Sequence, residues 1–396
     1  MVRKVVITWQ VSSFFGWGVY GLNLALNWAR DPDVQLLCAR QIPLGGLALD
    51  PLSREVIQPF LKASAELVET FRGHEGETAT GSGPVLSAFN ETFMKEPMTH
   101  GVLLNGRPDV GVTFLETAPL RPAAVERARR LPLILAGSSW NAAVLRAHGL
   151  EQVRTVLQGV EPALFHPAPR RGLLGDRFLV FSGGKAERRK GQDLVLSAFK
   201  VFAARHPEAL LVTAWSCPWP ELARSLDASG LAAPVRFRAD GALDVVGWAA
   251  ASGLPAAQIL DLGEAPNAAM APLLREMDVA LFPNRCEGGT NLVAMEAMAC
   301  GVPTILSANT GHLDLIGQDN CYPLTRQGEL AGVEGPFEGV GGWGESDVDE
   351  IVAALESVHA DREAARRRGL RGAETLAPMS WARTAAEVKA AVLDVC

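Results

Sequence analysis

A segment in the middle of the chain combines glycines with lysines, residue types that could bind an anionic ligand. Residues 181–193 read FSGGKAERRKGQD and follow an apolar run. Gly183 and Gly184 would let a ligand approach the backbone, and two lysines five positions apart, Lys185 and Lys190, could converge on one diphosphate. The spacing differs from that of a P-loop, GxxxxGK followed by Ser or Thr. On composition alone, a solvated basic turn before a helix is an equal alternative.

A second segment combines glycines, polar residues and one carboxylate within a helical pattern. Residues 283–303 read PNRCEGGTNLVAMEAMACGVP, which predicts a glycine loop, a helix that ends at Gly301 and then a strand. Small and polar residues at a helix start present free backbone N–H groups to an anion, and the helix dipole assists. Glu296 lies in this apolar helix, and because carboxylates are rarely buried alone, we expect it to accept hydrogen bonds from a ligand. A partly exposed surface glutamate is the alternative. The residues expected at the helix start are Gly288, Gly289, Thr290, Asn291 and Leu292.

A third glycine-rich segment follows the first apolar run. Residues 16–21 read GWGVYG and match GxGxxG, but Arg40 stands where a dinucleotide-binding fold would place an acid. A nicotinamide dinucleotide is therefore not expected. Gly16 and Gly18 are predicted in a loop after the first strand, where they would let a phosphate approach; a plain turn is the alternative.

Short apolar runs that alternate with helical patterns must position these segments. Runs without polar alternation fit strands that are buried on both faces of a parallel sheet, which binds ligands at the carboxyl ends of its strands. The expected strands are residues 5–9, 111–115, 133–136, 178–182, 209–213, 279–283 and 303–307. Helices are expected at residues 20–30, 347–374 and 380–395, a surface loop at 332–344, and a proline-rich linker at 165–172. The sequence thus predicts an α/β chain with two doubly wound domains and a cleft between them.

Composition limits the possible partners and compartments. The excess of 44 acidic over 37 basic residues, a net charge of −7, argues against a protein that coats nucleic acid. Six cysteines without CxxC spacing suggest neither a zinc site nor a disulfide scaffold, so we expect a reduced, cytoplasmic compartment. The uncharged stretch 5–29 is interrupted by polar residues and glycines, so no transmembrane segment is predicted, while contact with a membrane surface stays open.

The second segment resembles the signature of retaining GT-B glycosyltransferases, especially the large family-4 group, in which two glutamates precede AMAxGxP. Residues 184–191 are similar to the GRLxxxKG donor-phosphate motif of that group. Residues 138–141 (SSWN) and 158–161 (QGVE), with Phe165 and Pro167, resemble the end of its first domain. Ser380 and Trp381 resemble the start of its last helix. The resemblance covers residues 130–396 well and the first 130 residues only in layout.

The resemblance implies a GT-B fold of two Rossmann-like domains that face a central cleft. Residues 1–168 would form the acceptor side, residues 169–378 the nucleotide-sugar donor side, and residues 379–396 a helix that packs back on the first domain. The implied activity moves a sugar from a nucleotide-diphosphate sugar to a hydroxyl of a carbohydrate, a lipid-linked or another acceptor, with retention and without a cofactor. The two AspxAsp triplets, at 31–33 and 347–349, lie at helix ends away from the motifs, which agrees with metal independence.

The same resemblance implies roles for individual residues. Glu287 would orient the transferred sugar, Lys190 and Lys185 would bind the diphosphate, and Glu296 would accept from the ribose hydroxyls. Glu116, after the strand at 111–115, would be the acceptor base or a sugar contact; a neighbour of a helix cap is the alternative. The glycines expected to lie against the donor phosphates are Gly183, Gly184, Gly288, Gly289, Gly16 and Gly18.

Two departures from the family pattern stand in the motifs. Glu287 lies one position before the expected glutamate, so eight residues separate it from Glu296 where seven are typical. Lys185 replaces the usual arginine and supplies charge without a bidentate fork. Two alternatives therefore stay open: a non-catalytic GT-B module that binds a nucleotide sugar, and a GT-B sugar-nucleotide epimerase.

Overall fold

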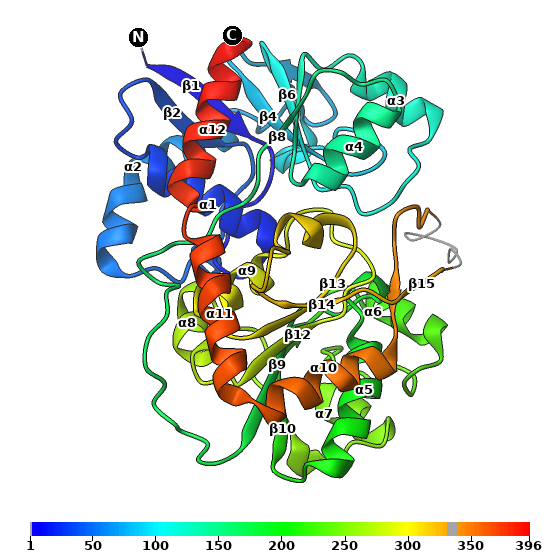
Figure 1. Ribbon diagram of the computed structural model, residues 1–396. Coiled ribbons are helices and arrows are strands. Elements are labelled where there is room, and N and C mark those ends of the chain that lie inside the picture. The colour runs from blue at the N-terminus through cyan, green and yellow to red at the C-terminus, as the bar shows by residue number, and fades with distance from the viewer. Residues whose placement is uncertain (1, 331–338) are drawn as a thin grey trace. The chain divides into compact units, whose positions relative to one another are not determined.

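The computed structural model describes residues 2–330 and 339–396, and the chain divides into two compact units (Figure 1). The first unit comprises Met1–Gly159, Pro266–Ala268 and Met379–Cys396, and the second comprises Val160–Ala265 and Ala269–Pro378. Each unit contains one six-stranded sheet whose paired strands are all parallel. The predicted fold class, a doubly wound α/β chain, is confirmed.

The sheet of the first unit has the order β2-β1-β4-β6-β7-β8. Its strands are β1 (Arg3–Ile7), β2 (Val34–Cys38), β4 (Val85–Phe89), β6 (Asp109–Thr113), β7 (Leu133–Ala136) and β8 (Val153–Thr155). The short strands β3 (Thr78–Thr80) and β5 (Leu103–Asn105) form a separate pair. The helices are α1 (Gly16–Trp28), α2 (Pro51–Glu69), α3 (Pro122–Ala128), α4 (Ser139–Ala147) and α12 (Trp381–Asp394).

The C-terminal helix α12 belongs to the first unit. The indole Nε1 of Trp28 in α1 donates to the carbonyl of Ala385 at 3.2 Å. Lys389 Nζ lies 2.7 Å from a carboxylate oxygen of Asp31, just after α1. Thr384 Oγ1 donates to the carbonyl of Leu157 at 2.9 Å. These contacts fasten the last helix to a segment more than 200 positions earlier in the chain.

The sheet of the second unit has the order β11-β10-β9-β12-β13-β14. Its strands are β9 (Phe178–Lys185), β10 (Ala209–Ser216), β11 (Ile259–Asp261), β12 (Val279–Phe282), β13 (Thr304–Ser307) and β14 (Tyr322–Leu324), and β15 (Gln327–Gly328) pairs with β16 (Glu345–Ser346). The helices are α5 (Gln192–Arg205), α6 (Pro220–Arg224), α7 (Val245–Ala251), α8 (Asn267–Leu274), α9 (Leu292–Ala299), α10 (Val348–Ala360) and α11 (Arg362–Leu376). Strand residues such as Val180, Leu211 and Val279 are fully buried, as expected for strands covered on both faces.

The prediction of a loop around Gly16 and Gly18 is wrong. Helix α1 begins at Gly16, four residues earlier than predicted, and the amide of Val19 already donates to the carbonyl of Phe15 at 2.9 Å. A Cβ on Gly18 would lie 2.5 Å from the Cβ of Ser12. Gly18 is thus required where the first turn of the helix packs on the preceding loop.

Three further segments differ from the prediction. Strand β9 continues through Gly183 and Gly184 to Lys185 and pairs with β10 along its whole length, so these glycines lie in a strand. The predicted helix at 347–374 is two helices, because Asp361 caps the start of α11 through the amide of Ala364 at 2.8 Å. The predicted loop at 332–344 falls mainly on residues 331–338, which lie outside the described residues.

The proline-rich stretch after residue 164 is held by the second unit. The carboxylate of Glu276 accepts from the backbone amides of Arg171 at 2.5 Å and Gly172 at 2.8 Å. The two units divide at Gly159, whereas the sequence placed the boundary after residue 168. Among the helices of the described chain, none is long and apolar enough to cross a membrane.

Candidate active site

The order of strands in the second unit reverses between β9 and β12. From β9 the chain continues to β10 on one side, and from β12 it continues to β13 on the other. Such a switch point is where parallel α/β sheets bind ligands, because the loops after the two strands diverge there. The two chemistry-bearing segments of the sequence are these loops, residues 186–191 and 283–291.

Gly191 allows the two loops to meet. It ends the short 3-10 turn at Arg188–Lys190 with φ of +72°, and a Cβ at this position would lie 2.6 Å from the carbonyl oxygen of Pro283. The amide of Arg285 donates to the carbonyl of Arg189 at 2.7 Å, which joins the backbones of the two loops directly. A side chain at position 191 would separate them.

A buried ion pair fastens the second loop to the start of α5. The guanidinium of Arg285 makes a bidentate contact with Asp193, at 2.8 and 2.7 Å, and both side chains are almost fully buried. Two further donors of Arg285 contact the carbonyl of Arg188 at 2.9 Å and the carboxylate of Glu345 at 2.7 Å. Planar, bidentate geometry of this kind fixes orientation as well as distance.

Glu287 lies at the centre of the site, and its residue is only 3% exposed. Its carboxylate contacts Lys190 Nζ at 2.5 Å and Arg189 Nη1 at 3.2 Å, and it accepts from the side-chain amide of Asn284. Its backbone amide donates to Thr310 Oγ1 at 2.8 Å. Burial opposes ionisation, but the charges of Lys190 and Arg189 prevail and lower the pKa of Glu287 to about 2. The carboxylate is therefore ionised at neutral pH.

A second buried carboxylate, Glu187, extends the charge cluster. Arg189 Nη2 lies 2.7 Å from Glu187 Oε1, so this arginine bridges Glu187 and Glu287. Lys185 Nζ lies 3.1 Å from Glu187 Oε2 and 5.3 Å from the centre of the Trp219 ring. Three cations thus surround two carboxylates at the carboxyl end of β9, an arrangement that attracts anions.

His312 supports the cluster as a neutral imidazole. Burial lowers the pKa of His312 to about 4 against the opposing charge of Glu287. Asn291 Nδ2 lies 3.0 Å from His312 Nε2, and His312 Nδ1 lies 3.2 Å from the carbonyl of Ser307. Since an amide NH₂ only donates and a carbonyl only accepts, this network assigns the hydrogen to Nδ1. His312 thereby connects the end of β13 to the start of α9.

Helix α9 begins at the same place. Asn291 has φ of +63°, and its side chain accepts from the amide of Ala294 at 3.4 Å. The residues before the helix, 288–291, are buried, and Glu296 within it is 5% exposed. Gly301 has φ of +77° just after the helix, as predicted for a helix end.

The structure brings most of the predicted site residues together. Lys190, Glu287, the two strand glycines of β9 and residues 288–292 lie at the switch point of one sheet. The two lysines do not converge as expected, because Lys185 pairs with Glu187 and Lys190 pairs with Glu287. Glu116 follows β6 in the first unit, together with Gly16 and Gly18 in α1, so these three form no part of the cluster within the second unit.

Several residues of the site are not predicted by the sequence pattern. Arg189 and Glu187 lie in the string KAERRKG, whose pattern predicts only a basic turn. Asn284, Asp193 and His312 carried no recognisable signal, because their partners lie elsewhere in the chain. Only the folded chain brings them together with their partners.

A family model matches part of the chain that includes half of this site. Residues 264–388 match a family described as Family 4 Glycosyltransferase in conflict systems. The matched segment contains Glu287, Glu296 and His312, whereas Lys190 lies before it. The resemblance inferred from residues 283–303 is therefore confirmed. No curated protein matches the chain significantly in sequence.

Solved structures share the fold over nearly the whole chain. Sucrose-phosphate synthase from Thermosynechococcus elongatus matches with a TM-score of 0.64 and 17% identity over 98% of both chains. HepE from Anabaena in complex with UDP-glucose matches with a TM-score of 0.63 and 13% identity, over 99% of this chain and 100% of that chain. A trehalose-6-phosphate synthase, studied for glycosyltransfer with retention, matches with a TM-score of 0.62 and 12% identity over 99% of both chains. At these identities the likeness shows the GT-B fold, and together with the family match it supports a transferase.

Removal of Asp193 should destabilise the protein far more than removal of an exposed carboxylate. The variant Asp193→Ala leaves the guanidinium of Arg285 buried without its bidentate partner, so we expect a loss of about 3–5 kcal/mol in the free energy of unfolding. The control is Glu126→Ala, which removes an exposed partner of Arg129 and should cost less than about 1 kcal/mol. Urea unfolding measures both, and equal losses would contradict the structural role of the buried pair.

His312 should make stability fall as the pH is lowered from 7.5 to 5. The pKa of His312 is about 4 in the folded protein, below the ordinary value of 6.5, so as the pH falls the unfolded chain takes up this proton at a higher pH than the folded protein does. The contribution of His312 to the free energy of unfolding is therefore complete above about pH 6.5 and is lost toward pH 4. Between pH 7.5 and 5 the loss should be roughly 2 kcal/mol. Urea unfolding of His312→Gln should lack this component, whereas the exposed His74→Gln should retain it. The same pH dependence in all three proteins would refute a buried neutral His312.

Proposed function

We propose that this protein transfers a sugar from a nucleoside-diphosphate sugar to a hydroxyl acceptor, with retention of anomeric configuration and without an obligatory metal. The observation that carries the proposal is the ionised, buried Glu287, which two cations hold beside the start of α9 at the switch point of the second sheet. The acceptor would be a carbohydrate, a lipid-linked or another hydroxyl compound.

The charge cluster supports a diphosphate as the leaving group. Lys190 Nζ has three donors, of which Glu287 engages one at 2.5 Å, so the ammonium can also contact a phosphate oxygen. Negative charge builds on that oxygen as the bond to the sugar breaks, and a fixed cation stabilises it most in the transition state. The backbone amides at the start of α9 would add to this stabilisation.

UDP-sugars are the first donors to test. HepE has been solved with UDP and with UDP-glucose, and it shares the fold over 99% of this chain. Glu296, buried in α9, would accept hydrogen bonds from the ribose hydroxyls of such a donor. Gly183 and Gly184, at the end of β9, would let the diphosphate approach the strand.

Glu287 is suited to orient the sugar rather than to attack it. Its oxygens are engaged by Lys190, Arg189 and Asn284, and its pKa of about 2 makes it a weak base and a weak nucleophile. Retention would then arise by reaction on one face of the sugar, with the donor phosphate helping to deprotonate the acceptor.

A screen of UDP-, GDP-, ADP- and TDP-sugars by thermal shift, followed by assay of the stabilising donor for hydrolysis, tests the proposal. A donor that binds only the folded state raises its apparent stability. We expect one donor to raise Tm and to be slowly hydrolysed, with UDP-glucose as the first candidate. Binding without any hydrolysis or transfer would instead indicate a non-catalytic module.

Lys190 should contribute more to turnover than Lys185. Lys190→Ala removes a buried cation beside Glu287, and the expected loss in kcat is roughly 100- to 1000-fold. Lys185→Ala is the matched control, because this lysine pairs with Glu187 and its side chain is 31% exposed; we expect a loss below about tenfold. Steady-state kinetics beside melting curves measure both. Parent-like turnover of Lys190→Ala would exclude this lysine from the diphosphate site.

Glu296→Gln should weaken donor binding while the protein stays folded. The amide keeps the size of the side chain but loses the charge that strengthens hydrogen bonds from ribose hydroxyls, so we expect Kd for the donor to rise about tenfold or more. Glu363→Gln, whose carboxylate side chain is 92% exposed, is the control and should bind like the parent. An unchanged Kd for Glu296→Gln in calorimetric titration would show that the ribose assignment is wrong.

A further inference from the structure

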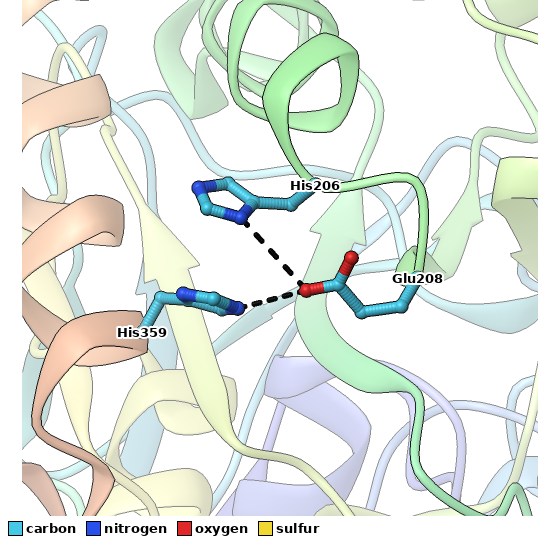
Figure 2. Close-up of side chains that lie close together, drawn as sticks. All are labelled: His206, Glu208 and His359. Carbon is cyan, nitrogen blue, oxygen red and sulfur yellow. Dashed lines mark hydrogen bonds and ion pairs between the residues drawn. The ribbon is translucent and has the colours of Figure 1, made fainter.

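Two histidines and a glutamate, from two distant segments of the chain, lie close together in the second unit (Figure 2). His206 follows α5, Glu208 precedes β10, and His359 lies in the last turn of α10. His359 Nε2 lies 2.9 Å from Glu208 Oε1, and His206 Nδ1 lies 3.8 Å from the same oxygen. Within the described residues, these form a group whose ligand-type atoms all lie within 4.8 Å of one another.

A second carboxylate orients one of the two imidazoles. His206 Nε2 lies 2.8 Å from Glu356 Oε2, and Arg205 holds the other oxygen of that carboxylate at 3.1 Å. A carboxylate paired with the Arg205 guanidinium accepts hydrogen bonds, which assigns the hydrogen of His206 to Nε2 and leaves the lone pair of Nδ1 directed toward Glu208.

This arrangement has the parts of a metal centre. Metal-bound histidines commonly donate their other ring N–H to a carboxylate, which fixes the tautomer and the ring, as Glu356 does for His206. Aromatic rings cover the inner side, since Phe202 lies 4.5 Å from the His206 ring and Phe178 lies 5.0 Å from the His359 ring. The side chains of His206 and His359 are 19% and 22% exposed, so an ion could enter from solvent.

We propose that His206, Glu208 and His359 bind one divalent transition-metal ion of the Zn²⁺ type. Imidazole nitrogens and a single carboxylate suit Zn²⁺ better than Mg²⁺ or Ca²⁺, which prefer oxygen ligands. Ligands at about 2.0–2.1 Å from a tetrahedral ion are roughly 3.4 Å apart. The separations of 2.9 and 3.8 Å from Glu208 Oε1 lie on either side of that value, and all three ligand atoms lie within 4.8 Å of one another, so side-chain rotations would bring them to one ion.

The position of this site indicates a structural role. It lies at the amino end of β10, whereas Lys185 pairs with Ser216 at the carboxyl end of that strand. The eight residues of β10 span roughly 25 Å, so the ion would be remote from the charge cluster around Glu287. Bound there, it would join the ends of α5 and α10 to the sheet and stabilise the folded state without taking part in sugar transfer.

The test measures Zn²⁺ binding by the full chain freed of metal with a chelator. We expect calorimetric titration to give one Zn²⁺ per chain, and we expect Zn²⁺ to raise Tm while Mg²⁺ at the same concentration does not. EDTA should reverse the rise in Tm and, at a temperature at which the metal-free protein is folded, leave sugar transfer unchanged. An equal response to Mg²⁺, or no response to Zn²⁺, would overturn the proposal.

Four variants make the assignment specific. His359→Gln and Glu208→Gln keep a hydrogen bond between these two positions but remove a ligand, so each should weaken Zn²⁺ binding by at least about tenfold. Glu356→Gln should weaken it by about 10- to 100-fold through loss of the orienting charge. His74→Gln alters an exposed histidine that pairs with Glu77, and it should bind Zn²⁺ like the parent. Far-UV circular dichroism without metal verifies folding. Parent-like affinity in both His359→Gln and Glu208→Gln, or an equal loss in His74→Gln, would refute the site.

Discussion

A buried carboxylate must be compensated by positive charge, and the compensation of Glu287 determines how the loops of the second unit are arranged at its switch point. Lys190 and Arg189 supply the charge from the loop after β9, while Glu287 belongs to the loop after β12. The two loops must therefore keep a fixed position relative to each other. The bidentate pair of Arg285 with Asp193 and the close approach at Gly191 fix that position. The cluster is thus held in place by the fold, and a donor diphosphate would find its charges already oriented.

Prediction from sequence succeeded where local pattern decides the structure. The apolar runs gave β7 and β13 to within a residue, and the small residues around α9 predicted a helix that ends at Gly301. It failed where side-chain packing and charge pairing decide: Gly18 lies in the first turn of α1, close against Ser12, and Lys185 pairs with Glu187 and not with the site of Lys190. The partners of a buried charge can be more than ninety positions away, as in the pair of Arg285 with Asp193, and no local spacing reveals them.

The two ends of the sheet in the second unit carry different groups of polar side chains. The carboxyl ends of β9 and β12 carry the charge cluster, where glycines and buried polar groups replace apolar packing. The amino end of β10 carries the histidine pair, which connects α5 and α10. Burying charge at one end costs stability, and a metal ion at the other end would offset part of that cost. The cysteine spacing suggests no zinc site, and the two histidines, 153 positions apart, could be associated only through the fold.

The proposed function requires that the cluster around Glu287 binds the diphosphate of a nucleotide sugar. The most direct test compares, by calorimetric titration at one salt concentration, the Kd of the nucleoside diphosphate that binds with the Kd of the matching monophosphate. Because the terminal phosphate should gain a charge-assisted hydrogen bond from Lys190, we expect the diphosphate to bind at least about tenfold more tightly. Equal affinity for the two nucleotides would contradict the placement of the diphosphate and, with it, the function proposed for this site.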